Sequence, residues 1–341
     1  MADLIEQACD LSLADAGYPV CRRAGELMNA AMWEACGGAC VRDAGRLLAD
    51  AVALHYRGIL GDFDGEVRVS DGSTGLQCAL FHLLGRRVRA YRGLVSRCAD
   101  AYVDTDGVAG PLALSAFTGY SVPCALEKED VALIYLCSPS PVTGEALPRR
   151  VLEEWVAFAA HRGCVLVLDT TLTPFVLSDG QANRYPRSVF CIEGADGCCA
   201  ELLSLSPRWS AGLDAGAVVT AGACRCALSA VESRMRYGRA SGTGRDVGAC
   251  RLSDYVLMRA AAGVFEPESE HEILSACRCY LERIRAVAAF LAARGLECGV
   301  CGASPFLLVR GAKTLTSMGI QGRDAATLSG AFCGFSVLSG F

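Results

Sequence analysis

The segment Val131-Ala-Leu-Ile-Tyr-Leu-Cys137 is a continuous apolar run that ends at Ser138-Pro139. An uninterrupted run of this length is typical of a parallel strand that is buried on both faces of a sheet. Residues 147–161 follow with apolar side chains at helical spacing, and Cys164-Val-Leu-Val-Leu-Asp169 is a second buried strand. Together these segments predict a right-handed βαβ unit. We therefore expect an α/β fold with a mostly parallel central sheet and helices on both faces.

Further elements are predicted on both sides of this unit. They are two helices within residues 20–57, a helix at 76–84, a long helix at 268–294, and strands at 67–69, 88–91, 306–309 and 334–341. A chain of 341 residues exceeds one ordinary core, so two domains are expected. We predict a large domain over residues 42–230 and a small α+β domain made of residues 1–41 with 231–341.

Composition argues against several classes of protein. The net charge is −5, and no basic stripe with interleaved aromatic residues occurs, so a nucleic-acid surface is not expected. No charge-free apolar run reaches the roughly 18 residues that a membrane span needs. The first ten residues are acidic and do not form the charged and apolar regions of a secretory signal. We expect a cytoplasmic protein that binds neither nucleic acid nor membrane.

The chain contains 20 cysteines but only four histidines. Cys298 and Cys301 form a lone CxxC, and no histidine lies at zinc-finger spacing from a cysteine pair. Cys277 and Cys279 fall in a helical pattern that places them on different faces. We therefore predict reduced cysteines that act as small apolar side chains, and no structural metal. A redox or metal-sequestering role is the weaker alternative.

The carboxyl edge of the predicted sheet is the first candidate site. Parallel strands bring Cys137 and Asp169 to the same edge, where open α/β sheets bind ligands. Asp169 ends an otherwise apolar strand, so its charge needs a partner there. A ligand contact and a structural role, such as a helix cap or a loop ion pair, are both open on this pattern alone.

Several stretches resemble blocks of one known family. They are Val69-Ser-Asp-Gly72, 101–105, Ile134 to Pro139 with Thr143-Gly144, 186–195 leading into Ser204-Leu-Ser206, and the closing segments 334–335 and 339–341. Through these motifs, from about Asp10 to Phe341, the chain resembles class I/II pyridoxal-phosphate-dependent aminotransferases of fold type I. The resemblance is strongest to the LL-diaminopimelate aminotransferases.

The resemblance implies a set of cofactor-binding residues that this sequence retains. In the family, backbone N–H groups at a helix start cradle the cofactor phosphate, an aspartate pairs with the pyridinium nitrogen, and hydroxyls lie near the phosphate. By position, these residues are Gly72, Ser73, Thr74, Asp169, Ser204 and Ser206.

The same resemblance implies that several functional residues of the family are replaced in this sequence. Pro207 stands where the family has the lysine that holds the cofactor as an aldimine, and proline has no side-chain amine. Further family positions for ring stacking, ring hydroxyl, phosphate and substrate carboxylate are occupied by Ala99, Pro141, Leu172, Asp214 or Ala215, and Val337. The only lysines are Lys128, predicted at the opposite edge of the sheet from Asp169, and Lys313, predicted in the small domain. Arginine cannot substitute, because it stays protonated.

These losses predict an aminotransferase-like pseudoenzyme with a binding or regulatory role and no catalytic residue at position 207. Pyridoxal phosphate is the cofactor that the resemblance implies. We expect no covalent attachment, although weak non-covalent binding remains open. The family also implies a dimer, either of this chain or with an active relative. The alternative is an active pyridoxal-phosphate-dependent amino-acid aminotransferase with a rearranged site.

Overall fold

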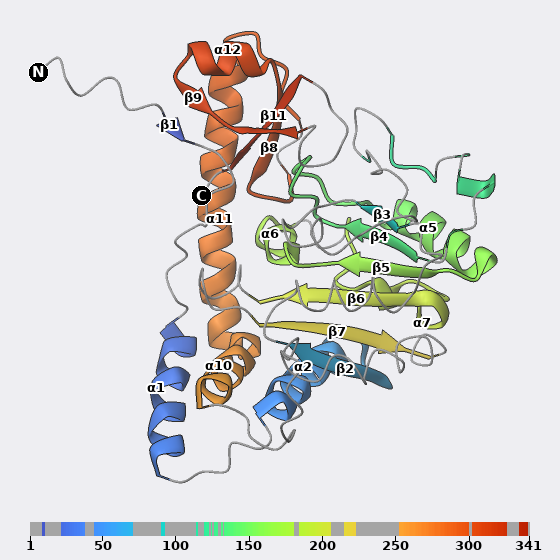
Figure 1. Cartoon of the computed structure of the whole chain (residues 1–341), viewed down its shortest axis with the longest axis vertical. Coiled ribbons are helices and arrows are strands. Elements are labelled where there is room, and N and C mark those ends of the chain that lie inside the picture. The colour runs from blue at the N-terminus through green and yellow to red at the C-terminus, as the bar shows by residue number, and fades with distance from the viewer. Residues whose placement is uncertain are drawn as a thin grey trace, which may run out of the picture.

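The computed structural model has a large central sheet flanked by helices and a small sheet beside the far end of one long helix (Figure 1). It describes residues 9–10, 22–37, 44–70, 90–92, 114, 119–122, 124, 126–128, 131, 133–180, 184–205, 215–222, 252–299, 302–325 and 334–339.

The central sheet has six strands in the order β2-β7-β6-β5-β4-β3. Their bounds are β2 (Gly65–Ser70), β3 (Ala90–Arg92), β4 (Leu133–Cys137), β5 (Val165–Asp169), β6 (Cys199–Ser204) and β7 (Gly216–Ala221). Strands β3 to β6 are mutually parallel, whereas β7 is antiparallel to both of its neighbours. The predicted α/β fold with a mostly parallel sheet is confirmed.

Helix α5 (Arg149–Arg162) completes the predicted βαβ unit and covers one face of the sheet. Its buried residues recur at helical spacing, with Trp155 fully buried and its indole N–H donating to the Tyr120 carbonyl at 3.1 Å. The helix begins at Arg149, two residues after the predicted start, because Pro148 serves as the N-cap. It ends at Gly163, which adopts φ 63° and donates to the Ala159 and Ala160 carbonyls.

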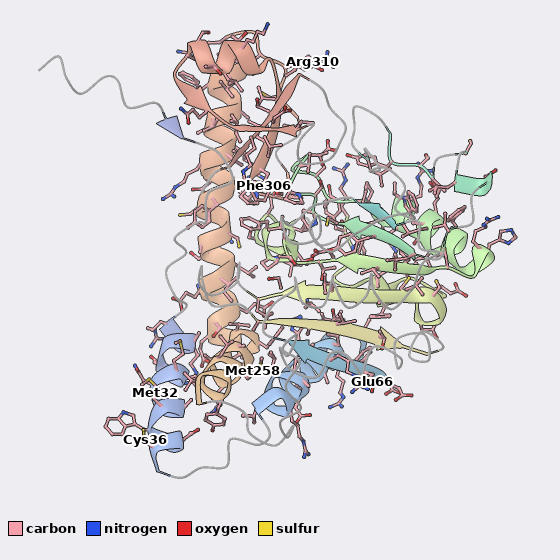
Figure 2. The ribbon with its side chains drawn as sticks, in the orientation of Figure 1. Met32, Cys36, Glu66, Met258, Phe306 and Arg310 are labelled. Atoms are coloured by element: carbon pink, nitrogen blue, oxygen red, sulfur yellow. The ribbon has the colours of Figure 1, made fainter. Side chains whose placement is uncertain are left out.

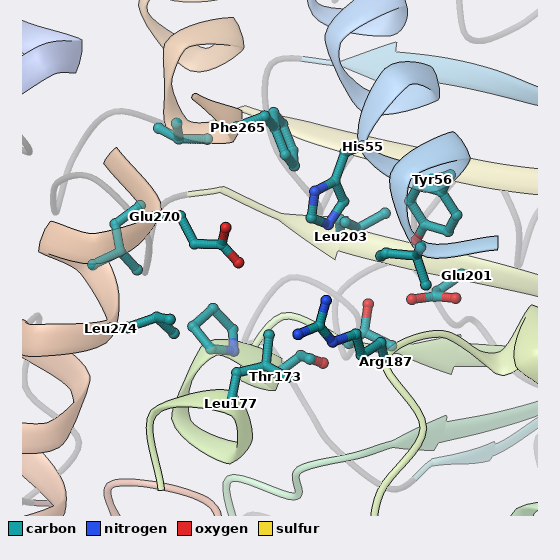
Figure 3. A pocket seen from close by; sticks show the side chains of 15 residues that line it. His55, Tyr56, Thr173, Leu177, Arg187, Glu201, Leu203, Phe265, Glu270 and Leu274 are labelled. Atoms are coloured by element: carbon teal, nitrogen blue, oxygen red, sulfur yellow. The ribbon is translucent and has the colours of Figure 1, made fainter. Parts of the chain in front are cut away.

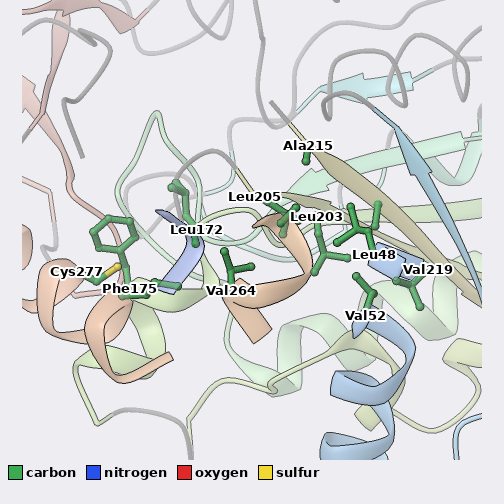
Figure 4. Close-up of a cluster of buried hydrophobic side chains, with 14 of the residues drawn as sticks. Leu48, Val52, Leu172, Phe175, Leu203, Leu205, Ala215, Val219, Val264 and Cys277 are labelled. Carbon is green, nitrogen blue, oxygen red and sulfur yellow. The ribbon is translucent and has the colours of Figure 1, made fainter. Parts of the chain in front are cut away.

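The same face is covered toward β7 and β2 by a second group of helices, which come from both ends of the chain. They are α1 (Arg22–Cys36), α2 (Ala44–Leu60) and α10 (Leu252–Ala262). Figure 2 labels Met32 on α1 and Met258 on α10. Residues of these helices share one hydrophobic cluster with β6 and β7, to which Leu48, Leu203 and Val219 contribute (Figure 4). This cluster contains side chains from both predicted domains, so the core is continuous across the predicted boundaries; the boundaries themselves remain predictions.

The long helix α11 (Pro267–Ala292) runs from α10 to the small sheet (Figure 1). The small sheet has the order β10-β11-β8, and β1 pairs with β9 nearby. The bounds are β1 (Cys9–Asp10), β8 (Phe306–Arg310), β9 (Ile320–Gln321), β10 (Arg323–Asp324), β11 (Phe335–Ser339) and the short helix α12 (Ala312–Ser317). The predicted helix at 268–294 and both predicted C-terminal strands are therefore present.

The remaining short elements connect these layers. They are η3 (Leu126–Lys128), α6 (Thr173–Ser178), η4 (Val189–Cys191), α7 (Ala195–Cys198) and η5 (Gly263–Phe265). A salt bridge joins the C-cap of α6 to α11, where Arg285 Nη2 lies 2.7 Å from Asp179 Oδ1. Strand β7 and helices α6 and α10 were not predicted from the sequence, and the predicted helix at 76–84 lies outside the described residues.

Half of the cysteines that the structure describes as free are buried, and Cys277 is buried on α11 while Cys279 is exposed, as predicted. The described part of the chain contains no group of three or more metal-binding side chains. Among the helices in these ranges, none has the length and apolar character to cross a bilayer.

Candidate functional site

Asp169 lies at the carboxyl end of β5, directly opposite Cys137 in the register of β4 and β5. The residue is 6% exposed, and its carboxylate accepts hydrogen bonds from described groups of the chain. The Tyr135 hydroxyl donates to Oδ2 at 2.5 Å, and the Thr171 N–H donates to Oδ1 at 3.0 Å. The predicted partner for the buried charge is therefore supplied by groups of the chain itself.

The electrostatics at this edge follow from burial. Burial raises the pKa of the Cys137 thiol well above its usual range, and the neighbouring Asp169 carboxylate raises it further. A buried thiol beside a carboxylate is held neutral, so Cys137 does not act as a thiolate nucleophile at neutral pH.

Ser204 ends β6 at the same edge and is buried. Its backbone N–H donates to the Thr171 hydroxyl at 3.1 Å, while the Thr171 N–H contacts Asp169. Thr171 therefore connects the two retained family positions that the structure describes. The family resemblance implied Asp169 and Ser204 for one cofactor site, and Thr171, which was not predicted, contacts both residues.

The turn after β4 closes over this edge. Ser138-Pro139 is a cis peptide, and the Ser138 hydroxyl accepts from the Leu147 N–H at 2.9 Å. The Ser140 hydroxyl accepts from the N–H groups of Val142 and Thr143 at 3.2 and 3.3 Å. These bonds hold the turn in one shape, and its Gly144 packs against the backbone of β8.

Four of the altered family positions are described, and three of them belong to the hydrophobic core. Leu172, Val337 and Ala215 are buried and belong to the hydrophobic cluster shared with α2 and α10 (Figure 4 labels Leu172 and Ala215). Val337 is fully buried and pairs with Leu308 of β8. Where the resemblance expects polar partners for a cofactor ring and a substrate carboxylate, the structure has apolar side chains.

The turn position Pro141 is half-buried. Several other predicted positions lie outside the described residues. These are Gly72, Ser73, Thr74, Ala99, Ser206, Pro207 and Asp214.

The lysines lie where the sequence predicts. Lys313 is exposed on α12, in the unit built on the small sheet. The η3 turn that contains Lys128 lies beside the C-terminal end of α5, because Arg162 donates to the Glu127 carbonyl at 3.2 Å. That end of α5 leads into the amino end of β5, so the backbone of Lys128 is at the opposite edge from Asp169.

Asp169 can accept a hydrogen bond from the pyridinium nitrogen of pyridoxal phosphate. Each oxygen of an ionised carboxylate has two acceptor sites, so Asp169 retains capacity for a pyridinium N–H beside its bonds to Tyr135 and Thr171. No lysine is brought to Asp169 within the ranges that the structure describes. The described residues thus fit the ring nitrogen and do not fit covalent attachment of the cofactor.

Two site residues have no signal in the sequence pattern. Tyr135 lies in an apolar run and reads as a core aromatic, and Thr171 lies in the turn after β5. Tyr135 shares a face of β4 with Cys137, so it is a diagonal neighbour of Asp169 across two strands. The contact between Tyr135 and Asp169 follows only from the register of β4 and β5, which the sequence does not show.

The fold has counterparts among solved structures, and the sequence has homologues. The chain has the architecture of the pyridoxal-phosphate-dependent aminotransferases of fold type I. Its homologues include LL-diaminopimelate aminotransferases at 25–27% identity. No sequence-family model matches the chain.

Two relatives from Prochlorococcus marinus illustrate the similarity in sequence. The LL-diaminopimelate aminotransferase of strain MIT 9303 is 27% identical over 258 residues, which cover 68% of this chain and 58% of that protein. The enzyme of strain NATL1A is 25% identical over 274 residues, covering 74% and 63%. The chain thus spans about three fifths of the length of these curated relatives.

Solved structures show the similarity in fold. The L,L-diaminopimelate aminotransferase from Chlamydomonas reinhardtii superposes with a TM-score of 0.78 at 19% identity, covering 98% of this chain and 86% of that chain. A probable N-succinyldiaminopimelate aminotransferase from Thermus thermophilus gives 0.76 at 19% identity, covering 97% and 89%.

Proposed function

We propose that this chain is an aminotransferase-like pseudoenzyme, which retains the scaffold for a binding or regulatory role and has lost covalent pyridoxal-phosphate catalysis. The observation that carries the proposal is Pro207 at the position of the cofactor-binding lysine. Proline offers no amine, and its ring also removes a backbone donor. A lysine that acts as general base contributes a factor of about 10²–10⁴ through proton transfer alone.

The apolar character of two other positions supports the same proposal. Leu172 and Val337 belong to the hydrophobic core, where the family resemblance expects a hydroxyl and a guanidinium. Loss of a charged hydrogen-bond partner for a substrate carboxylate costs about 1.5–3 kcal/mol of binding. Several such changes in one site do not leave a partly active enzyme, because each removes a different function.

One observation favours the alternative, an active amino-acid aminotransferase with a rearranged site. Asp169 is retained at the carboxyl edge with spare acceptor capacity. We assign it to residual, weak and non-covalent binding of pyridoxal phosphate. We further propose a cytoplasmic protein that forms dimers, either with itself or with an active relative, as the family resemblance implies.

An activity assay tests the proposal. The protein is incubated with excess pyridoxal phosphate, a 2-oxo acid and a panel of amino donors that includes LL-diaminopimelate, the substrate in the relatives' names. The expected result is no amino transfer above that of an Asp169→Ala variant prepared in the same way. Transfer that Asp169→Ala abolishes would establish the rearranged active site instead.

A further inference from the structure

A pocket lies between α2, β6, α6 and the segment from η5 into α11 (Figure 3). We propose that this pocket binds a small zwitterion, an α-amino acid of the size of glycine or alanine. Its lining includes Thr170 but neither Asp169 nor Cys137. The inference goes beyond the proposed function, because it does not depend on the state of the cofactor site.

The size of the pocket restricts its ligand. Its volume is about 40 Å³. One water molecule needs about 10–15 Å³ on this measure, so the pocket accepts a molecule of a few heavy atoms. Pockets for cofactors and drug-sized ligands are about 300–1,000 Å³, so pyridoxal phosphate is too large for it.

Two opposite charges face this space, on residues that are both exposed to solvent. The Arg187 guanidinium and the Glu270 carboxylate both point into the pocket, from different walls (Figure 3). Arg187 comes from the segment before η4, and Glu270 comes from the first turn of α11. Neither forms a salt bridge to another residue in the described ranges. A ligand that carries both charges neutralises both groups.

A buried acid fixes the wall that carries Arg187. Glu201 is 2% exposed and accepts from the Ser188 hydroxyl at 2.6 Å and from the Val189 N–H at 3.1 Å. Burial raises the pKa of Glu201, and these bonds together with the Tyr56 hydroxyl oppose that rise. Because its donors come from the chain itself, Glu201 positions the residues that follow Arg187 and does not bind the ligand.

The wall formed by Phe265 and Leu274 is apolar, and His55, Thr170 and Thr173 add polar groups beside it. Phe265 packs against His55 with ring centroids 5.0 Å apart, and both line the pocket with Leu274. A ligand carboxylate on Arg187 forms charge-assisted hydrogen bonds in the bidentate geometry that guanidinium favours. Its ammonium pairs with Glu270, and a hydrogen or methyl group faces the apolar wall.

Calorimetric titration of the full chain tests the ligand class. Glycine and L-alanine are expected to bind. Acetate and methylamine carry one charge each and are expected to bind at least about ten-fold more weakly, because one charged contact is missing. L-Leucine is expected to bind more weakly than L-alanine. Absence of binding by glycine and alanine, or acetate binding as tightly as glycine, would overturn the proposal.

Variants locate the ligand. Glu270→Gln and Arg187→Gln should each weaken glycine binding about ten-fold or more. Glu268→Gln is the matched control, because Glu268 is exposed in the same turn of α11 and does not line this pocket. It should leave the affinity unchanged, as should Asp169→Asn. Binding that Asp169→Asn weakens and Glu270→Gln does not would place the ligand at the strand edge and contradict the proposal.

Discussion

A Val337→Arg variant is expected to lose about 3–5 kcal/mol of unfolding free energy, because it places a guanidinium in an apolar core. Val337 is fully buried in β11, where it pairs with Leu308 and Arg323. Its hydrophobic cluster also contains Leu172 and Phe306. Arginine is the residue that the family resemblance expects at this position, so the variant tests whether the site still accommodates it.

Urea denaturation measures this loss, with Val337→Ile as the control for added volume. Isoleucine adds one methylene to a packed core and is expected to cost about 1–3 kcal/mol, less than the arginine. A Val337→Arg protein as stable as the parent would show that the arginine reaches solvent or an anionic partner. The conclusion that apolar core side chains occupy the position expected for the carboxylate-binding arginine would then be wrong.

Gly144→Ala is expected to lower the free energy of unfolding by about 2–5 kcal/mol, from backbone strain together with overpacking. Gly144 adopts φ +73°, and a Cβ atom there would lie 1.9 Å from the Phe306 carbonyl oxygen and 3.0 Å from its carbonyl carbon. Both atoms belong to the backbone of β8, so no side chain can move aside. This contact brings the turn after β4 against the small sheet.

Gly163→Ala separates the cost of backbone strain from the cost of overpacking. Gly163 has a similar φ of +63°, but a Cβ there would have no atom within 4 Å. This variant should lose only the cost of the left-handed backbone, about 1–2 kcal/mol. Thermal and urea unfolding of both variants give the comparison. Equal losses would mean that the approach of the turn to β8 does not contribute to stability.

Much of the fold could be predicted because it depends on local patterns. The apolar runs that end at Cys137 and Asp169 predicted two parallel strands, and the structure aligns these residues in register. The helical spacing of α5 and α11 predicted their buried faces. Strand β7 could not be predicted in the same way, because Gly216 to Ala221 is a short apolar run that carries no sign of its antiparallel direction.

The sites were harder to predict because their contacts join distant segments. Asp169 was recognised from its place at a strand end, but its donor Tyr135 depends on the register of two strands. Glu201 lies in an otherwise apolar strand, and its partners come from a turn 12 and 13 residues away. The pocket above it is lined by α2, α6 and α11, which only the folded chain brings together.

The central claim is that this aminotransferase scaffold has no lysine that can hold pyridoxal phosphate. Mass spectrometry of the intact protein after incubation with equimolar pyridoxal phosphate and borohydride reduction tests it most directly. With two lysines in the chain, both sites can be followed individually. The account predicts no stoichiometric adduct on Lys128 or Lys313. A one-to-one adduct on either lysine that is lost in Asp169→Ala would contradict it.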